Sequence, residues 1–258
     1  MALSTRAAVM FDLWNTLIFE PGNLENSELR RELRADYLVE TLKELGETVN
    51  RGEIFRSFVN ISDEMTAGHD DGLDRHFGEW VSLGLSRIDA GLPDRIGLVG
   101  LVEVGSAIDR SFIDCPPELL EGSLEVLDQI GSLGLEIALI TNTGLTSGGA
   151  FRDWFANIGL LSRLGHTSYS NEMGLSKPDR QMWDAATRAL SVVPERVLHV
   201  GDNLHTDVAG AAAIGMSTVW VSGSSLSTAN KSVEPDYTVE AITEMLPIVD
   251  NWLETLES

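Results

Sequence analysis

Short apolar runs that stop at polar residues mark both ends of the chain. The first run covers residues 7–11, and later runs cover residues 135–140, 197–200 and 216–221. Near-continuous apolar runs of this length are typical of strands that are buried on both faces of a parallel sheet. The stretches between the later runs have helical spacing, so strands alternate with helices. This alternation predicts a doubly wound α/β fold with a parallel sheet and right-handed crossovers.

Five amphipathic stretches and one short extended piece complete the expected α/β unit. Gly134 ends the first of these helices, as glycine commonly does. The expected helices cover residues 119–133, 151–158, 179–190, 207–214 and 242–256, and the extended piece lies near residues 166–170.

The segment from about residue 24 to residue 110 has a different pattern. Apolar residues recur at helical spacing over residues 29–45, 54–65, 76–85 and 96–108, and no strand-like alternation interrupts them. We therefore expect an all-helical insertion of four or so helices, packed as a small bundle.

The ends of this insertion define the predicted domains. Cys115-Pro116-Pro117 is interpreted as the connection back to the first unit, because consecutive prolines cannot continue a helix. The expected division is an α/β core domain of residues 1–18 and 115–258 with a helical domain of residues 19–114.

Composition and charge narrow the class of protein. Hydrophobic residues make up 43% of the chain and charged residues 22%, which is ordinary for a globular protein. The single cysteine, Cys115, excludes an intramolecular disulfide and a thiolate metal cluster, and a cytoplasmic location fits it best. No run approaches the ~18 apolar residues of a membrane span, so we expect neither secretion nor a membrane protein.

The formal net charge of -22 argues against binding to nucleic acid or to anionic membranes. Phosphate backbones are bound by clustered lysines and arginines, which this charge balance disfavours. An anionic small molecule remains compatible with the sequence, provided that local cations or a metal ion reverse the field at its site.

Polar residues follow three of the predicted strands directly. Asp12 ends the first run, Thr141-Asn142 ends the second, and Gly201-Asp202 ends the third. Each could be a simple turn cap, since aspartate, asparagine and threonine commonly bond their own backbone in turns. A cap has no reason to recur at three strand ends, however, and ligands bind beyond the carboxyl ends of parallel strands. We therefore predict a functional site at this edge of the sheet.

Four motifs in this order carry a resemblance to a known family. They are Asp12-Leu13-Trp14-Asn15-Thr16, Thr141-Asn142, Lys177-Pro178 and Gly201-Asp202-Asn203-Leu204-His205-Thr206-Asp207. The chain resembles the haloacid dehalogenase-like (HAD) hydrolase superfamily, whose members are mostly magnesium-dependent phosphatases. The resemblance covers roughly residues 5–20 and 115–250. The helical insertion sits where family members carry a cap domain, and nothing in it matches a subfamily.

The resemblance implies a mechanism for the aspartates. Asp12 would be the nucleophile that attacks phosphorus and forms an aspartyl-phosphate. Asp12, the main-chain carbonyl of Trp14 and Asp202 would hold Mg²⁺, which offsets the charge of a phosphate approached by a carboxylate. Asp207 would lie in or just behind the metal shell, or else cap its own helix. Asn203 is interpreted as a turn former rather than a ligand.

The resemblance also implies binding residues for a small phosphorylated substrate. Thr141 and the backbone donors near Asn142 would bind the phosphoryl oxygens. Lys177 would place a positive charge beside Asp12 and keep it ionised. Each has a plain structural alternative, a turn cap for Thr141 and a solvated loop lysine for Lys177.

Trp14 departs from the family pattern. Family phosphatases place a second aspartate two residues after the nucleophile, where it protonates the leaving group and then activates water. An indole has no usable acid or base function. Three interpretations follow: a phosphatase for good leaving groups or with its acid in the cap, a 2-haloacid dehalogenase-like hydrolase, or a binding module without activity.

Further polar and aromatic residues are weaker candidates. His69, His76 and the neighbouring aspartates are better explained as a solvated helix junction than as a metal site. His199 is interpreted as a core histidine and His205 as either a cleft or a surface residue. Five tryptophans are assigned to packing, namely Trp80, Trp154, Trp183, Trp220 and Trp252.

Overall fold

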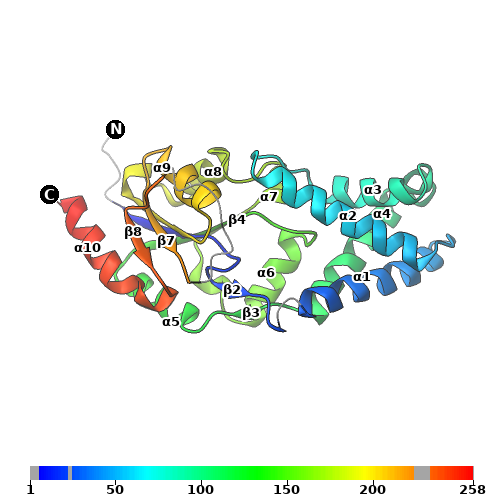
Figure 1. Cartoon of the computed structure of the whole chain (residues 1–258), viewed down its shortest axis with the longest axis horizontal. Helices are drawn as coiled ribbons and strands as arrows, with labels where there is room; N and C mark the ends of the chain where they lie inside the picture. The colour runs from blue at the N-terminus through cyan, green and yellow to red at the C-terminus, as the bar shows by residue number, and fades with distance from the viewer. Residues whose placement is uncertain (1–5, 23–24, 224–232, 258) are drawn as a thin grey trace.

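The computed structural model describes residues 6–22, 25–223 and 233–257 (Figure 1). Six strands form one parallel sheet in the order β5-β4-β1-β6-β7-β8, which confirms the predicted α/β class. These strands are β1 (Ala8–Phe11), β4 (Glu136–Thr141), β5 (His166–Tyr169), β6 (Val197–Gly201), β7 (Ser217–Val221) and β8 (Tyr237–Val239).

Strand β1 lies in the middle of the sheet and is fully buried. Its residues point alternately to the two faces, as the pleat of a strand requires. Val9 and Phe11 belong to one hydrophobic cluster, whereas Ala8 and Met10 belong to another. This two-sided burial explains why residues 7–11 form an uninterrupted apolar run.

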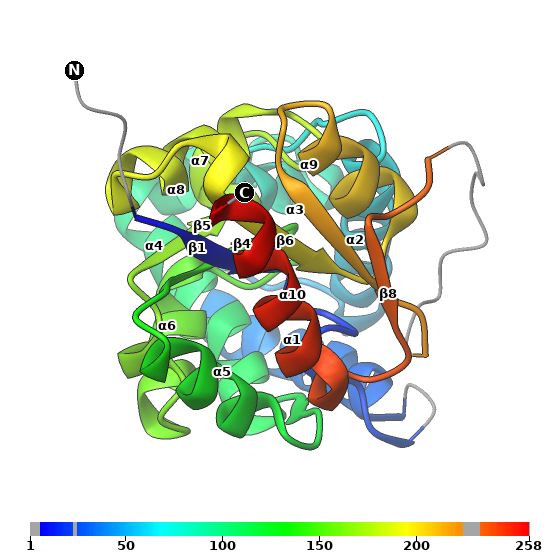
Figure 2. The ribbon, with the colours of Figure 1, turned by 90° about the vertical axis from the view of Figure 1, so that its left-hand side faces the viewer.

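Helices cover both faces of the sheet (Figure 2). Helices α5, α6 and α10 contribute to the cluster that contains Phe11, and α8 and α9 contribute to the cluster that contains Met10. The bounds of these helices are α5 (Ser123–Ser132), α6 (Gly148–Asn157), α8 (Gln181–Leu190), α9 (Gly210–Ala212) and α10 (Met245–Glu257). Short helical segments join them, namely α7 (Ser170–Met173), η2 (Leu161–Arg163), η3 (Pro194–Arg196), η4 (Leu204–Ala209) and η5 (Ile242–Glu244).

The insertion between β1 and β4 is helical, as predicted. Its helices are α1 (Glu25–Glu44), α2 (Arg51–His69), α3 (Phe77–Ile88) and α4 (Leu92–Asp114), and they enclose a hydrophobic cluster of their own. At its base the short strands β2 (Ile18–Phe19) and β3 (Glu118–Leu119) pair in antiparallel fashion. Among the described residues, no helix is both long enough and apolar enough to cross a bilayer.

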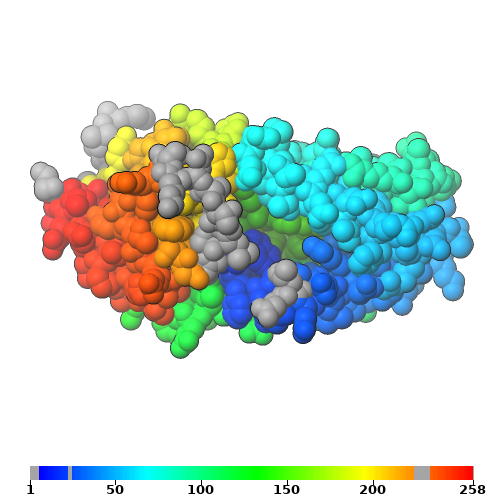
Figure 3. Space-filling view, in the orientation of Figure 1, coloured from blue at the N-terminus to red at the C-terminus, as the bar shows by residue number. Residues whose placement is uncertain are grey.

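The insertion and the core share side chains along their boundary, where the two units lie against each other (Figure 3). Phe112 of α4 packs into the core cluster, with its ring centroid 4.7 Å from that of Phe151. Leu145 of the core belongs in turn to the cluster of the insertion. The proposed domain boundaries near residues 18 and 115 stay a prediction, and residues 1–5 and 258 lie outside the described residues.

Several sequence expectations were wrong in detail. The helix expected at residues 119–133 begins only at Ser123, because Leu119 pairs with Ile18 in the β2–β3 ribbon. The helix expected at residues 207–214 is a π-helix, η4, that leads into α9. Strand β8 was not predicted, since three residues are too few to show a periodic pattern.

Candidate functional site

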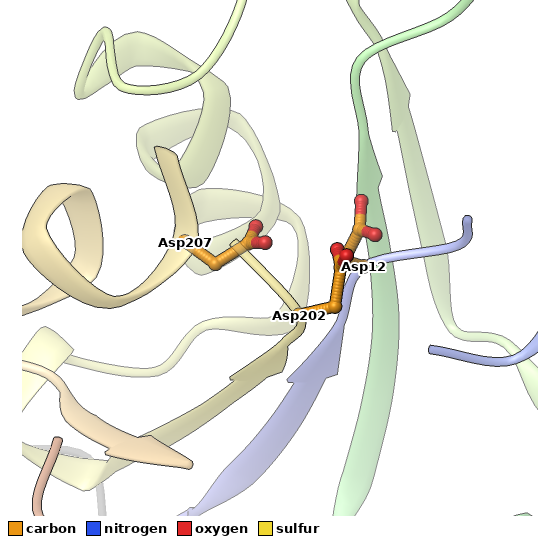
Figure 4. Close-up of side chains that lie close together, drawn as sticks. All are labelled: Asp12, Asp202 and Asp207. Carbon is orange, nitrogen blue, oxygen red and sulfur yellow. The ribbon is translucent and has the colours of Figure 1, made fainter. Parts of the chain in front are cut away.

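Three buried aspartates meet at the carboxyl edge of the sheet (Figure 4). Asp12 follows β1, Asp202 follows the neighbouring strand β6, and Asp207 extends from η4. One oxygen from each carboxylate lies within 4.8 Å of the others. Within the described parts of the chain, no other group of three or more histidines, cysteines or acidic residues is arranged to hold a metal ion. The structure thus brings together Asp12 and Asp202, which the strand-end pattern predicts, with Asp207, which the family resemblance adds.

The backbone of β6 makes this approach possible. The amide of Asp12 donates to the carbonyl oxygen of Val200 at 2.8 Å, which continues the β1–β6 ladder up to Asp12. A Cβ atom at Gly201 would overlap the carboxyl group of Asp207. Glycine at the end of β6 therefore leaves the space into which Asp207 turns.

Lys177 forms ion pairs with two of these carboxylates, those of Asp12 and Asp207. Its Nζ donates to Oδ1 of Asp12 at 2.6 Å and to Oδ1 of Asp207 at 2.5 Å, and its side chain is only 2% exposed. Burial opposes the charged form of Lys177, but the two carboxylates outweigh it and raise the pKa of the ammonium group. Lys177 is therefore a buried, paired cation, which excludes its alternative as a solvated loop residue.

Asn142 holds the backbone that carries this lysine. Its Nδ2 donates to the carbonyl oxygen of Lys177 at 3.1 Å, and its Oδ1 accepts from the amide of Lys177 at 2.7 Å. Thr141 is fully buried at the end of β4, which pairs with β1, the strand that precedes Asp12. The second motif thus fixes the position of the third, a contact that no sequence pattern indicated.

His199 and Trp183 form a buried pair behind Asp207. An indole N–H can only donate, so its bond to Nδ1 of His199 at 3.2 Å leaves that nitrogen unprotonated. The proton of the neutral ring therefore lies on Nε2, which donates to Oδ1 of Asp207 at 3.2 Å. Burial also lowers the pKa of His199 and keeps the ring neutral. His199 is buried as expected, but its hydrogen bond to Asp207 was not foreseen.

The carboxylate of Asp207 is held by hydrogen-bond donors of the protein. Besides Lys177 and His199, it accepts a bond from the amide of Asn203 at 3.1 Å. Burial opposes ionisation of Asp207, but Lys177 and His199 outweigh it and lower the pKa of this carboxyl. Asn203, not Asp207, caps the following segment, since its Oδ1 accepts from the amides of His205 and Thr206. Asp207 thus bonds the amide of the residue that begins the segment, and its place in or behind a metal shell stays a prediction.

Asp202 is the third carboxylate of the cluster and is 8% exposed. Burial and the charges of Asp12 and Asp207 raise the pKa of its carboxyl well above the usual range. Asn15, whose φ of 56° is left-handed, donates to Asp202 at 3.3 Å, and the Trp220 indole donates to the carbonyl oxygen of Asp202 at 2.8 Å. Trp183 is buried in the core as expected, whereas Trp220 is only partly buried, and both indoles also bond polar groups of the site.

The charge balance of the site suits a divalent cation. Three carboxylates against one ammonium leave an excess of two negative charges when all four groups are ionised. Burial raises the pKa of Asp12, and Lys177 opposes that rise without cancelling it. Opposite oxygen ligands of Mg²⁺ lie about 4.2 Å apart, so the carboxylate oxygens of Asp12 and Asp202 need only a small adjustment to share one ion. The residues present thus fit a magnesium site.

Trp14 is partly buried and packs with its ring edge toward Phe151, at a centroid distance of 6.5 Å and an interplanar angle of 80°. Both residues line a pocket of about 380 Å³ between the core and the insertion. The indole thus forms part of the wall of a cavity next to Asp12 and packs against the core.

Much of the segment of residues 69–76 is exposed, as expected of a solvated junction, but Asp74 is an exception. The side chain of Asp74 is fully buried, accepts a bond from the Trp80 indole at 2.6 Å and lies 3.3 Å from Nε2 of His69. His205 bonds the carbonyl oxygen of Asp70 at 2.8 Å. This segment docks against the core, which the local sequence could not show.

The chain is similar to known proteins in sequence and in fold. A family model described as HAD-hydrolase-like matches residues 174–245, which include Lys177, Asp202 and Asp207. The chain is 26% identical over 250 residues to a glyceraldehyde 3-phosphate phosphatase of Methanopyrus kandleri, with 94% of this chain and 96% of that protein covered. It is 27% identical over 260 residues to a ribulose-1,5-bisphosphate 5-phosphatase of Halopiger xanaduensis, at 94% and 98% coverage. The fold is similar to that of a 2-haloacid dehalogenase from Pseudomonas syringae pv. Tomato, with a TM-score of 0.68, 18% identity and 96% and 100% coverage.

The charge arrangement predicts opposite effects for two similar substitutions. In the presence of a chelator, Asp202→Asn should stabilise the protein by on the order of 1–3 kcal/mol, because it removes like-charge repulsion from a buried cluster. Asp207→Asn should destabilise it by roughly 3 kcal/mol, because it breaks a buried ion pair with Lys177. Urea unfolding measures the free energy of unfolding of each variant. If the two substitutions change it in the same direction, this account of the site is contradicted.

Proposed function

Because the chain belongs to the HAD-like hydrolase superfamily, we propose that it is a magnesium-dependent phosphatase that hydrolyses a small phosphorylated metabolite through an aspartyl-phosphate on Asp12. The observation that carries this proposal is the buried contact of Lys177 with Asp12 and Asp207. Two relatives that align over nearly the whole chain are named as phosphatases of phosphorylated sugars. The net charge of -22 supports a small substrate rather than a nucleic acid.

The first chemical step is attack of an Asp12 carboxylate oxygen on phosphorus. A new P–O bond forms to Asp12 as the bond to the leaving oxygen breaks, and the leaving group keeps the electron pair. Lys177 holds Asp12 in place through its 2.6 Å contact and offsets negative charge in the transition state. Water then attacks phosphorus, releases inorganic phosphate and regenerates the carboxylate of Asp12.

The residues that would hold Mg²⁺ are Asp12, the carbonyl group of Trp14 and Asp202. When bound, Mg²⁺ would neutralise the excess charge and allow a phosphate dianion to approach a carboxylate. Asp207 lies behind this group, because its oxygens accept bonds from Lys177, His199 and the amide of Asn203. Its role is to hold Lys177, and His199 and Trp183 hold Asp207 in turn.

Trp14 restricts the substrates that such a site handles well. No carboxylate stands two residues after Asp12, and the carboxylate of the adjoining pocket, Glu20, already accepts two bonds from Arg30. The leaving group must therefore depart without a proton from Trp14. Acyl and aryl phosphates have leaving groups of this kind, so we expect faster turnover on them than on alkyl phosphates.

A dehalogenase reaction also fits a tryptophan at this position, because halide leaves without a proton. The buried cluster of three carboxylates favours the phosphatase, since it places an excess negative charge where a metal-free reaction on a carboxylate substrate would need cations.

Thr141, buried at the end of β4, would bind a phosphoryl oxygen next to Asp12.

Magnesium binding provides a direct test of the site. Calorimetry with Mg²⁺ and beryllium fluoride, a phosphate mimic, should show binding to the parent protein. Asp12→Asn and Asp202→Asn should lose it, because each removes a charged ligand, whereas Asp250→Asn, an exposed control in α10, should bind as the parent does. If both site variants bind as well as the parent, the metal site lies elsewhere.

The missing acid provides a second test. Trp14→Asp should raise activity on alkyl phosphates by roughly ten- to a hundredfold, or about 1.4–2.7 kcal/mol of barrier, because it restores a proton donor. The gain on p-nitrophenyl phosphate should be small, since p-nitrophenolate leaves unaided. Steady-state kinetics measure both gains.

Trp14→Leu is the matched control, because it removes the indole that packs on Phe151 without adding an acid. Melting temperatures of both variants separate lost packing from lost chemistry. If Trp14→Asp folds and shows no selective gain on alkyl phosphates, the missing aspartate is not what limits this protein.

A further inference from the structure

The pocket beside the site has walls from both parts of the chain. Trp14 and Asn142 line it on the side of the core, and Arg31 and Arg34 line it on the side of helix α1. Its volume of about 380 Å³ is in the range of sites for small ligands. Since Trp14 lies two residues after Asp12, a substrate whose phosphate reaches Asp12 would extend into this pocket.

Arg34 is buried in this wall without a protein partner. Only 7% of the residue is exposed, and within the described residues its guanidinium makes no hydrogen bond or ion pair. Its neighbour Arg30, by contrast, has hydrogen-bond partners in the protein. Arg30 donates to both oxygens of Glu20 and to the carbonyl oxygen of Cys115.

Among the described residues, no nearby carboxylate forms an ion pair with Arg34, although the charge of Asp109 partly offsets its burial. Glu20 is occupied by Arg30, and Asp109 accepts from the amide and the hydroxyl of Ser147 at 2.8 and 2.6 Å. Burial, together with Arg30 and Arg31, lowers the pKa of Arg34, and the charge of Asp109 only partly opposes this. The ordinary pKa of arginine lies so far above neutrality that the group stays charged. A buried charge without a partner destabilises the fold. The chain has 40 acidic residues, yet none of those described pairs with Arg34. We therefore expect an anionic ligand to bind this guanidinium.

We propose that Arg34, with Arg31 beside it, binds a second anionic group of the substrate, a carboxylate or a second phosphate, at the end away from the phosphate that is cleaved. This inference rests on the proposed phosphatase function and specifies its substrate class. A guanidinium presents paired N–H donors that match either group bidentately. The substrate is thus a compact molecule with one anion at Asp12 and another at α1.

Direct binding tests this inference without turnover. Propylphosphonate carries one anion, and 3-phosphonopropionate carries a carboxylate at the other end of a chain of similar length. In the presence of Mg²⁺, calorimetry on the parent protein should show tighter binding of 3-phosphonopropionate. Arg34→Met should weaken the binding of 3-phosphonopropionate by about tenfold or more, as expected for a lost charge-assisted hydrogen bond. It should weaken the binding of propylphosphonate far less.

Arg56→Met is the matched control, because it removes the same side chain from an exposed position on α2. It should leave both affinities near those of the parent. Propane-1,3-bisphosphonate, with a second phosphonate, distinguishes the two sources of the anion: preference for it indicates a bisphosphate substrate, and preference for the carboxylate indicates a phosphorylated acid.

Thermal unfolding separates a binding role of Arg34 from a structural one. Without ligand, Arg34→Met should keep or raise the melting temperature, because methionine preserves the aliphatic stem and removes an unpaired charge. A lower melting temperature together with unchanged affinity ratios would assign Arg34 to stability and overturn the inference. Equal binding of all three ligands by the parent would also overturn it, whereas failure of the parent to bind any phosphonate would refute the phosphatase function itself.

Discussion

The site depends on one buried interaction, the contact of the Lys177 ammonium group with the carboxylates of Asp12 and Asp207. Neither partner could be buried alone, because an unpaired charge in a protein interior is strongly unfavourable. Asn142 fixes the backbone of Lys177, and His199 fixes Asp207. The charges that face a substrate are therefore held in position before it binds, which is the arrangement that electrostatic catalysis requires.

The same loop connects the site to the helical insertion. The amide of Ser176, next to Lys177, donates to the carbonyl oxygen of Gly72 at 3.1 Å, and Leu175 pairs with Leu73 through an isolated bridge. The insertion thus docks on the segment that positions the lysine. Its helix α1 supplies Arg34 to the pocket, so the core provides the reactive groups and the insertion lines the space around the rest of the substrate.

Patterns within single segments predicted much of this protein. The apolar run at residues 7–11 predicted the central strand, and the polar residues at strand ends located Asp12 and Asp202, because parallel strands bring their carboxyl ends to one edge. Contacts between distant segments could not be predicted in this way. Neither the bond of His199 to Asp207 nor the burial of Arg34 has a local signature, since both depend on how α8 and the insertion pack. The strand β8 was not predicted, because its three residues are too few to show a pattern.

The central claim is that Asp12 attacks phosphorus, and trapping the covalent intermediate tests it most directly. The parent protein is mixed with Mg²⁺ and acetyl phosphate, quenched in acid within a single turnover, digested and analysed by mass spectrometry. The account predicts a peptide that contains Asp12 and carries the mass of one phosphoryl group, which hydroxylamine removes and which is absent from Asp12→Asn. Release of phosphate by the parent protein without this adduct, or with the adduct on another residue, would contradict the claim.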